Sequence, residues 1–301
     1  MQGVHFWVLG TFLLGGAVMA GAPSPVDARQ QPAPPVAERP LPDFDAFEVQ
    51  VKARLRTDRA LQANYTFLER RDEIEISKLG RVSTGTVKTY EVYPSPEPGN
   101  TYKRLVAVNG VALPADELAR NDEKHRKDVL DRVNESAGER ARHEREAEAD
   151  RREERDAIDE IFRVYDINMV GRETVGGYPT IVATVEPRRA YQPASDDGRM
   201  MKRFRARVWV HEFDYQLVKV WLEAVDDVTY GWGLVARLHR GAIVTYERRK
   251  VNDEVWLPAR MEIAGSGRTL VFRGFQLDAI TEWSDYKRFQ VKTDEKFGGT
   301  P

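Results

Sequence analysis

The 301-residue chain contains no cysteine, which excludes disulfides, thiolate catalysis, cysteine-ligated metals and an N-terminal cysteine for lipid attachment. It also lacks an excess of one charge, since 46 Lys and Arg residues face 48 Asp and Glu residues. A net charge of −2 produces no field that attracts nucleic acid, so nucleic acid is not an expected partner. The hydrophobic share of 41% is enough for a sizeable core.

No apolar run is as long as the ~20 residues that a membrane-spanning helix needs. The longest one, Phe6–Ala20, is followed by Ala20-Gly21-Ala22, which has the small-x-small form of a signal-peptidase site. We therefore predict a secretory signal over residues 1–22, with no stable membrane span after its cleavage. Only His5 and the terminal amine precede the apolar run, so an uncleaved N-terminal anchor stays open as the alternative. Both place the body of the protein outside the cytoplasm.

The common catalytic and metal-binding motifs are absent from the sequence. His211-Glu212 resembles the start of a zinc-protease motif, but Tyr215 stands where the second histidine is required. The glycine-rich stretches 231–233 and 265–267 do not lie between a strand and a helix, as a phosphate loop requires. We interpret them as kinks and turns.

Paired carboxylates are the remaining route to catalysis. Glu223 and Asp226-Asp227 lie close together in the sequence, but a single turn does not give them the opposed positions and separated pKa values that acid–base chemistry needs. They are interpreted as a solvated turn. The sequence therefore predicts no catalytic residue, no metal site and no cofactor, and the protein is not expected to be an enzyme.

The chain divides into a linker, one folded domain and a short tail. Residues 23–42 contain seven prolines and almost no large apolar side chain, so we predict that they form an extended linker. The predicted domain covers residues 43–290, and residues 291–301 form a C-terminal tail. The domain begins with an amphipathic helix in which Phe44, Phe47 and Val51 share a face and Asp43 is the N-cap.

Most of the domain shows the period of two that is typical of strands. Hairpins are predicted over residues 64–113 and 164–187, and a polar loop over 188–202. An antiparallel meander follows over residues 201–289. In its first strand the even-numbered residues 204–210 are apolar and share one face, while the odd-numbered ones fall on the other. The predicted strands of the meander cover residues 204–211, 217–225, 228–238, 242–250, 255–264 and 269–277.

A highly charged segment interrupts the strands at residues 115–162. Fourteen of the eighteen residues from Glu139 to Asp156 are charged, and none of the eighteen is large and apolar. This composition predicts a solvated helix that contacts the body only near its ends. Ser136-Ala137-Gly138 is predicted to break it into the two arms of a helical hairpin.

Three phrases of the sequence resemble the LolA-like superfamily, which includes the periplasmic outer-membrane lipoprotein carrier and lipoprotein-sorting proteins. They are Val170–Tyr178 (VGRETVGGY), Val208–Val210 with Asp214–Lys219 (VWV and DYQLVK), and Val251–Pro258 (VNDEVWLP). The resemblance covers roughly Phe44 to Phe289. It implies an α+β fold in which a strongly curved antiparallel sheet, an incomplete β-barrel, carries helices on its concave side around a cavity for lipid acyl chains.

Several meander strands carry large apolar residues on both faces, and a sheet of this kind needs cover on both sides. Two interpretations of these residues remain open: a cavity for cargo, or an ordinary core beneath helices. The candidate cargo-binding residues are Trp209, Trp221, Tyr230, Trp232 and Leu234.

The sequence thus favours a lipid or lipoprotein binding protein, or carrier, in the periplasm of a Gram-negative type of bacterium. Its cargo would be lipid or lipoprotein acyl chains. The alternative is a protein-interaction or envelope-sensor module on the same scaffold, which contacts an envelope protein through residues 115–162.

Overall fold

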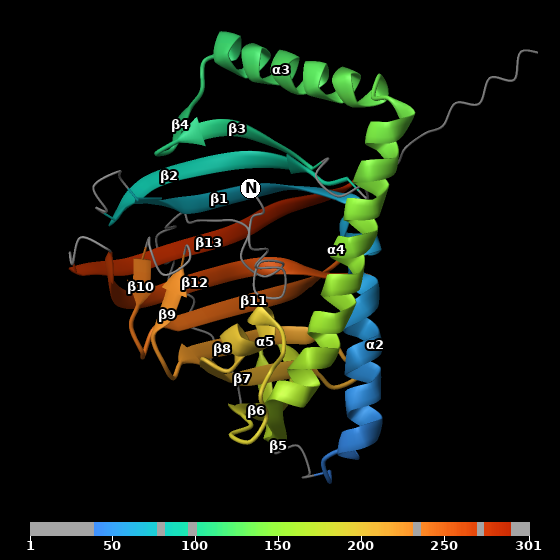
Figure 1. The fold of residues 1–301 in the computed structure, drawn as a ribbon, viewed down its shortest axis with the longest axis vertical. Coiled ribbons are helices and arrows are strands. Elements are labelled where there is room, and N and C mark those ends of the chain that lie inside the picture. Colours follow the sequence, from blue (N-terminus) through green and yellow to red (C-terminus); the bar gives the residue numbers. More distant parts are fainter. Residues whose placement is uncertain (1–38, 77–81, 96–100, 231–235, 270–273, 290–301) are drawn as a thin grey trace, which may run out of the picture.

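The computed structural model describes residues 39–76, 82–95, 101–230, 236–269 and 274–289 (Figure 1). The helices in these ranges are α2 (Phe44–Gln62), α3 (Ala115–Val133), α4 (Ala137–Val164) and α5 (Asp196–Met201). The strands are β1 (Tyr65–Ile76), β2 (Val82–Tyr93), β3 (Tyr102–Val108), β4 (Val111–Ala112), β5 (Tyr165–Val175), β6 (Tyr178–Pro187), β7 (Phe204–His211), β8 (Leu217–Ala224), β9 (Val228–Tyr230), β10 (Ala236–Leu238), β11 (Ile243–Val251), β12 (Val255–Thr269) and β13 (Gly274–Arg288). The predicted signal, most of the predicted linker and the tail lie outside the described residues. Within the described residues, no helix is long and apolar enough to cross a membrane.

A single antiparallel sheet contains all of these strands. Its order is β4-β3-β2-β1-β13-β12-β11-β8-β7-β6-β5, and the short strands β9 and β10 branch from β12. Strands β4 and β5 stand at the two ends of this order, so the sheet is open and not a closed barrel. Figure 1 shows the sheet curving from β5 to β3, with helices beside it. The predicted fold class, a curved antiparallel sheet that forms an incomplete barrel, is confirmed.

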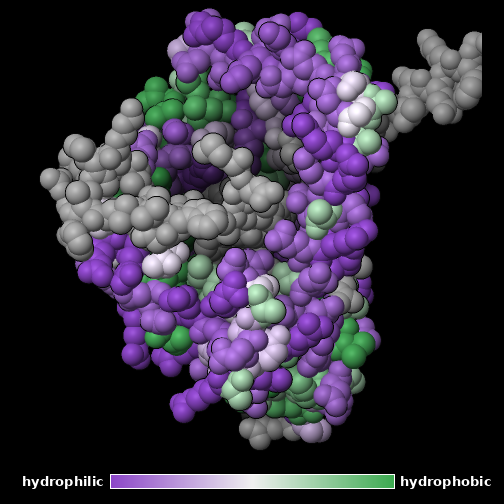
Figure 2. Space-filling view, in the orientation of Figure 1, coloured by the Kyte–Doolittle hydropathy of each residue, from purple (hydrophilic) through white to green (hydrophobic). Residues whose placement is uncertain are grey.

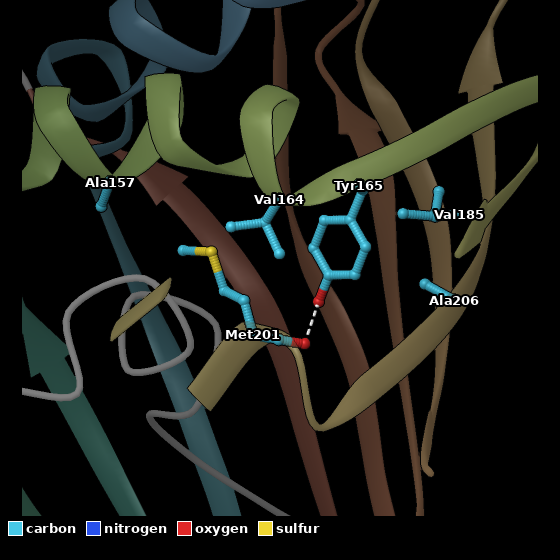
Figure 3. Close-up of a cluster of buried hydrophobic side chains, with 6 residues drawn as sticks. All are labelled: Ala157, Val164, Tyr165, Val185, Met201 and Ala206. Carbon is cyan, nitrogen blue, oxygen red and sulfur yellow. Dashed lines mark hydrogen bonds between the residues drawn. The ribbon is translucent and has the colours of Figure 1, made fainter. Parts of the chain in front are cut away.

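Helices α2, α4 and α5 pack on one face of the sheet, which we call the inner face. The end of α4 contributes Ala157 and Val164 to a buried cluster with Val185 of β6 and Ala206 of β7. In this cluster the Tyr165 hydroxyl donates a hydrogen bond to the main-chain oxygen of Met201 in α5 (Figure 3). The cluster fixes α4 and α5 over the strands from β5 to β8.

Helix α2 begins where the sequence predicts it. Its first turn is capped by Asp43, whose Oδ1 accepts a hydrogen bond from the main-chain N–H of Ala46 at 2.9 Å. Phe47 and Val51 are buried on the inner face, against residues of β6 and β7. The apolar stripe of α2 therefore covers the same end of the sheet as α4.

The charged segment consists of two helices that join at the predicted break. Ser136 caps α4 and forms a capping box with Glu139, while α3 ends at Val133. The two helices are not the arms of a hairpin, because α3 runs across the top of the molecule and α4 descends along its side (Figure 1). No residue of α3 is buried, whereas α4 reaches the core with its last turns.

Four polar residues attach α3 to β3. The Arg104 guanidinium donates two hydrogen bonds to the Asp122 carboxylate, both at 2.8 Å. The Tyr102 hydroxyl donates to the same carboxylate at 2.8 Å, and the His125 ring stacks on the Tyr102 ring at 3.8 Å. Helix α3 is therefore held to the sheet by charge and stacking more than by apolar burial.

Three details of the region from residue 188 onward differ from the sequence-based prediction. Residues 228–238 are not one strand, because β9 and β10 pair with each other and the chain reverses between them. The stretch 265–267 is not a turn but lies inside β12, where Gly267 leaves no room for a side chain: a Cβ would lie 2.4 Å from the Arg237 oxygen. The loop 188–202 contains the short helix α5.

Candidate functional site

Two of the five predicted cargo-binding residues lie on the outer face of the sheet, opposite the helices. Trp221 pairs with Arg207 across β7 and β8, and Trp209 is two residues along from Arg207 in β7. Val208, between them, packs against the α4 cluster on the inner face. Because successive side chains of a strand point to opposite faces, Trp209 and Trp221 point away from the helices.

Polar contacts surround Trp209 on the outer face. Its indole Nε1 donates to Glu173 Oε2 at 2.7 Å, and the charged ends of Arg207 and Lys219 lie over its ring at 5.4 and 5.7 Å from the centroid. Such cation–π contacts hold the indole in place without an apolar pocket. Trp232 and Leu234 lie outside the described residues, as does the side chain of Tyr230 at the end of β9. The cargo-binding role of all five stays a prediction.

Strand register shows that the outer face is charged. A transverse row of directly paired residues runs across it and alternates in sign from Lys219 onward. The row consists of Trp209, Lys219, Glu247, Arg260, Glu282 and Arg70. The expectation that the meander is apolar on both faces is therefore wrong for this row.

The matching row on the inner face changes character along its length. It begins with apolar residues on β7, β8, β11 and β12, passes a hydroxyl on β13, and ends with two cations on β1 and β2. The row consists of Val208, Val220, Tyr246, Met261, Thr281, Arg71 and Lys88. The inner face is thus apolar at one end and cationic at the other.

The apolar part belongs to a group of side chains that we call the strand cluster. Its centre is formed by Tyr246, Met261 and Trp283, and only 4–6% of the surface of each residue is exposed. The other members are Phe67, Val220, Val244, Ile263 and Tyr286. All eight come from strands, so within the described residues no helix contributes to this cluster, unlike the clusters beneath α2 and α4.

The polar part is a group of five charged residues on β1, β2 and β3 that we call the charged ladder. Lys103 Nζ donates to both carboxylate oxygens of Glu69, at 3.0 and 2.7 Å. Arg71 Nε donates to Glu73 Oε1 at 2.6 Å, and Lys88 Nζ lies 3.8 Å from Glu73. The inner face of β1–β3 therefore carries connected ion pairs where the rest of the face carries apolar side chains.

The electrostatics of the ladder favour the charged form of Glu73. Burial acts to raise the pKa of Glu73, but the hydrogen bond from Arg71 and the charges of Arg71 and Lys88 outweigh it, so this pKa lies below its ordinary value. The neighbouring Tyr90 hydroxyl donates to Glu73 at 3.2 Å. Burial raises the pKa of Tyr90, which keeps the phenol protonated and able to donate.

The charged ladder is not predicted from the sequence. Its signal is the alternation in β1, where Phe67, Glu69 and Arg71 share a face because they are two residues apart. The apolar residues of this strand change parity, from Tyr65 and Phe67 to Ile74, and a bulge between Glu73 and Glu75 is where the register shifts. Glu69 and Lys103 are 34 residues apart, so their contact depends on the order of three strands.

The carboxylates considered for catalysis each have cationic partners. Arg205 donates to Glu223 at 2.9 and 2.6 Å, and Arg203 donates to Asp226 at 3.2 Å. Asp227 Oδ2 lies 3.8 Å from the Arg237 guanidinium. Each of the three carboxylates is thus part of its own ion pair.

His211 contributes to a turn. Its Nδ1 accepts a hydrogen bond from the Asp214 main-chain N–H at 3.0 Å, and Trp256 donates to the Asp214 carboxylate at 2.9 Å. Burial lowers the pKa of His211, while the Asp214 carboxylate acts in the opposite direction. In the part of the chain that the structure describes, no three His, Asp or Glu side chains are grouped so that they could hold a metal ion.

A groove of about 330 Å³ lies at the edge of the sheet, between α2, the end of α4 and β5. Phe44, Phe162 and Ile167 form its apolar part, and Glu48 and Arg188 are among its charged residues. This groove is mostly polar, and it is separate from the strand cluster and the charged ladder.

Comparison with known proteins identifies likenesses in structure alone. No family model and no curated protein matches the sequence. Among solved structures, the chain is similar to a putative outer membrane lipoprotein-sorting protein domain from Vibrio parahaemolyticus, with 11% identity over 82% of this chain and 94% of that one and a TM-score of 0.31. It is also similar to a DUF1329 family protein from Desulfovibrio piger, with 11% identity, 82% and 93% coverage and a TM-score of 0.28.

One chain in the structure of the MucA/MucB complex of Pseudomonas aeruginosa is also similar. The identity is 12% over 79% of this chain and 93% of that chain, and the TM-score is 0.21. The structures found thus include the class of protein that the sequence resembles, a lipoprotein-sorting domain. All of these TM-scores are below 0.5, so the description of the fold rests on the order and register of this chain's own strands.

Proposed function

We propose that the protein is a periplasmic lipid or lipoprotein binding protein, or carrier, that holds an acyl chain on the inner face of its curved sheet. The observation that supports this is the strand cluster, a group of apolar side chains on the same face as α2 and α4, to which no described helix contributes and whose five outer members are only partly buried. An apolar chain can occupy the place that a helix takes over β5–β8. The proposal involves no chemical step.

The energy of such binding comes from apolar burial. Each methylene group removed from water contributes about 0.8 kcal/mol, so ten methylene groups contribute roughly 8 kcal/mol before the loss of mobility is subtracted. The outer face offers no comparable surface, because its central row is charged. The inner face is therefore the cargo surface of this proposal, in place of Trp209 and Trp221.

A matched pair of substitutions tests the proposal. Ile263 is a partly buried member of the strand cluster, whereas Ile280 lies on the outer face as the partner of Glu262. Displacement of a fluorescent fatty acid is expected to weaken in Ile263→Asn and to remain unchanged in Ile280→Asn, which introduces the same chemical change. Native mass spectrometry of protein from a periplasmic fraction is expected to show a bound lipid. Equal displacement by both variants, with no lipid on the purified protein, would exclude the proposal.

A second candidate function is binding of an envelope protein through residues 115–162. The observation that favours it is α3, which buries no residue and leaves Val129, Leu130 and Val133 exposed at 44%, 46% and 67% of their surface. Leu130→Glu and Val133→Glu should leave the fold intact and abolish a crosslink to such a partner. Val111→Glu, at a residue that is 71% exposed on β4, is the control.

A further inference from the structure

From the charged ladder we infer that the cargo is an amphiphile with an anionic head, such as a phosphate or carboxylate group, bound by Arg71 and Lys88 beside its apolar chain. This inference rests on the proposed function and adds the chemical class of the cargo. It is drawn from the inner-face row, which passes from Met261 through Thr281 to Arg71 and Lys88 on neighbouring strands.

The accessible charge of the ladder is positive, although three cations face two carboxylates. Glu69 is only 1% exposed, and Lys103 occupies both of its oxygens. Glu73 is 16% exposed, whereas Arg71 and Lys88 are 27% and 29% exposed. A ligand that approaches this part of the inner face therefore meets mainly guanidinium and ammonium groups, which bind phosphate and carboxylate oxygens.

The spacing of the strands matches a single amphiphile. Met261 on β12 and Arg71 on β1 are separated by β13, which is two inter-strand steps or about 10 Å at roughly 4.8 Å each. A chain that lies on the strand cluster can thus place its head at Arg71. Thr281, between them, adds a hydroxyl at the point where the row changes from apolar to charged.

The surface has a suitable shape at this place. Figure 2 shows the molecule hollowed beneath α3, at the level of the strands β1–β3, and the surface there is hydrophilic. The outer-face row differs, because Arg260 stands directly opposite two carboxylates, Glu282 and Glu247, whereas Arg71 and Lys88 of the inner-face row are two cations paired with each other. An anionic head is therefore expected on one side of the sheet only.

The test compares three probes that separate head from chain. Dodecyl phosphate carries both parts, dodecyl maltoside carries the same chain with a neutral head, and inorganic phosphate carries the anion alone. Titration calorimetry on the full chain is expected to show dodecyl phosphate binding about tenfold more tightly than dodecyl maltoside, the difference that one charge-assisted hydrogen bond gives. Inorganic phosphate is expected to bind more weakly than either amphiphile.

Substitutions assign this preference to the ladder. Arg71→Gln and, separately, Lys88→Gln are expected to remove most of the preference for dodecyl phosphate and to leave the affinity for dodecyl maltoside unchanged. Lys88 lies 3.8 Å from Glu73, so its loss disturbs the fold less than the loss of Arg71. Arg205→Gln is the control, because Arg205 pairs with Glu223 on the outer face.

Three outcomes would count against the inference or its basis. Equal affinity for the two amphiphiles, unaffected by Arg71→Gln and Lys88→Gln, would overturn the anionic head and leave the proposed function standing. Failure of both amphiphiles to bind would overturn the proposed function itself. Binding of inorganic phosphate as tight as that of dodecyl phosphate would show a site for a free anion, and would overturn the assignment to a lipid head.

Discussion

Lys103 of β3 reaches across β2 to Glu69 of β1, and its ammonium group contacts both oxygens of a carboxylate that is only 1% exposed. Removal of the lysine would leave a buried carboxylate without this partner, which is costly because the charge has lost its hydration. Lys103→Met is therefore expected to lower the free energy of unfolding by about 3 kcal/mol, the lower end for buried pairs because Lys103 itself is partly exposed.

Urea denaturation measures this loss, and a double variant gives the control. Lys103→Met combined with Glu69→Gln removes both charges, so most of the lost stability should return. A double variant as unstable as the single one would show that the lysine acts through packing of its side chain and not through Glu69.

The attachment of α3 should depend on pH through Asp122. The hydrogen bond from Arg104 and, to a smaller extent, the one from Tyr102 hold the pKa of Asp122 below its ordinary value. A lowered pKa means that the attachment is fully stabilised above the ordinary carboxyl pKa of about 3.9 and is lost as the pH falls through the lowered value. The protection factors of the amides in residues 115–133, measured by hydrogen exchange and mass spectrometry from pH 6 to pH 3 and corrected for the slower intrinsic exchange in acid, are expected to fall at the acid end.

A pair of isosteric substitutions isolates this effect. Asp122→Asn should expose α3 to exchange already at pH 6, whereas Asp128→Asn, at an exposed position of the same helix, should leave the exchange unchanged. Similar exchange in both variants would mean that the ring stack of Tyr102 and His125 is enough to hold the helix.

The turn between β7 and β8 should contain a neutral histidine at weakly acidic pH. Burial lowers the pKa of His211, and its unprotonated Nδ1 accepts the Asp214 main-chain N–H at 3.0 Å. This interaction stabilises the fold above the ordinary histidine pKa of about 6.5, and its contribution is lost as the pH falls through the lowered value. The NMR titration of the His211 ring is therefore expected to have its midpoint below 6.5.

Asp214→Asn provides the complementary measurement. The Asp214 carboxylate favours the protonated ring, so its removal should lower the midpoint of His211 further. A midpoint that moves upward in this variant would contradict the assignment of the two opposing effects.

Gly267 of β12 should tolerate no side chain. A Cβ there would lie 2.4 Å from both the Arg237 oxygen and the Phe275 ring, and the oxygen belongs to the main chain of β10. Gly267→Ala is expected to lower the melting temperature. Gly138→Ala is the comparison, because its Cβ would meet nothing nearer than 3.9 Å in α4 and alanine favours helices by up to about 1 kcal/mol. Equal melting temperatures of the two variants would show that β10 can move aside.

Local sequence patterns predict the elements of this fold better than they predict which face of the sheet a side chain is on. The period of two indicates the strands, and the Asp43 cap and the Ser136 break are both visible in the sequence. The same period places Trp221 beside Lys219 and Glu223, on the face opposite Val220 and Leu222. Trp209 and Trp221 are candidates because of their size, but their parity within β7 and β8 places both on the outer face.

The ladder required information that a single sequence does not carry. Arg71 meets Thr281 because the last strand of the domain, β13, pairs with its first, β1. Nothing in residues 65–76 indicates this neighbour, since the pairing joins strands more than 200 residues apart. The change from apolar to cationic along the inner-face row therefore becomes visible only when the order of the strands is known.

The outer-face row also determines how the molecule affects its surroundings at a distance. From Lys219 to Arg70, neighbouring strands about 4.8 Å apart carry charges of opposite sign, and this spacing is less than the Debye length of about 8 Å at physiological salt. Three cations and two carboxylates in this alternation largely offset one another, so at a distance the row acts as about one positive charge. Association through this row should therefore respond little to ionic strength.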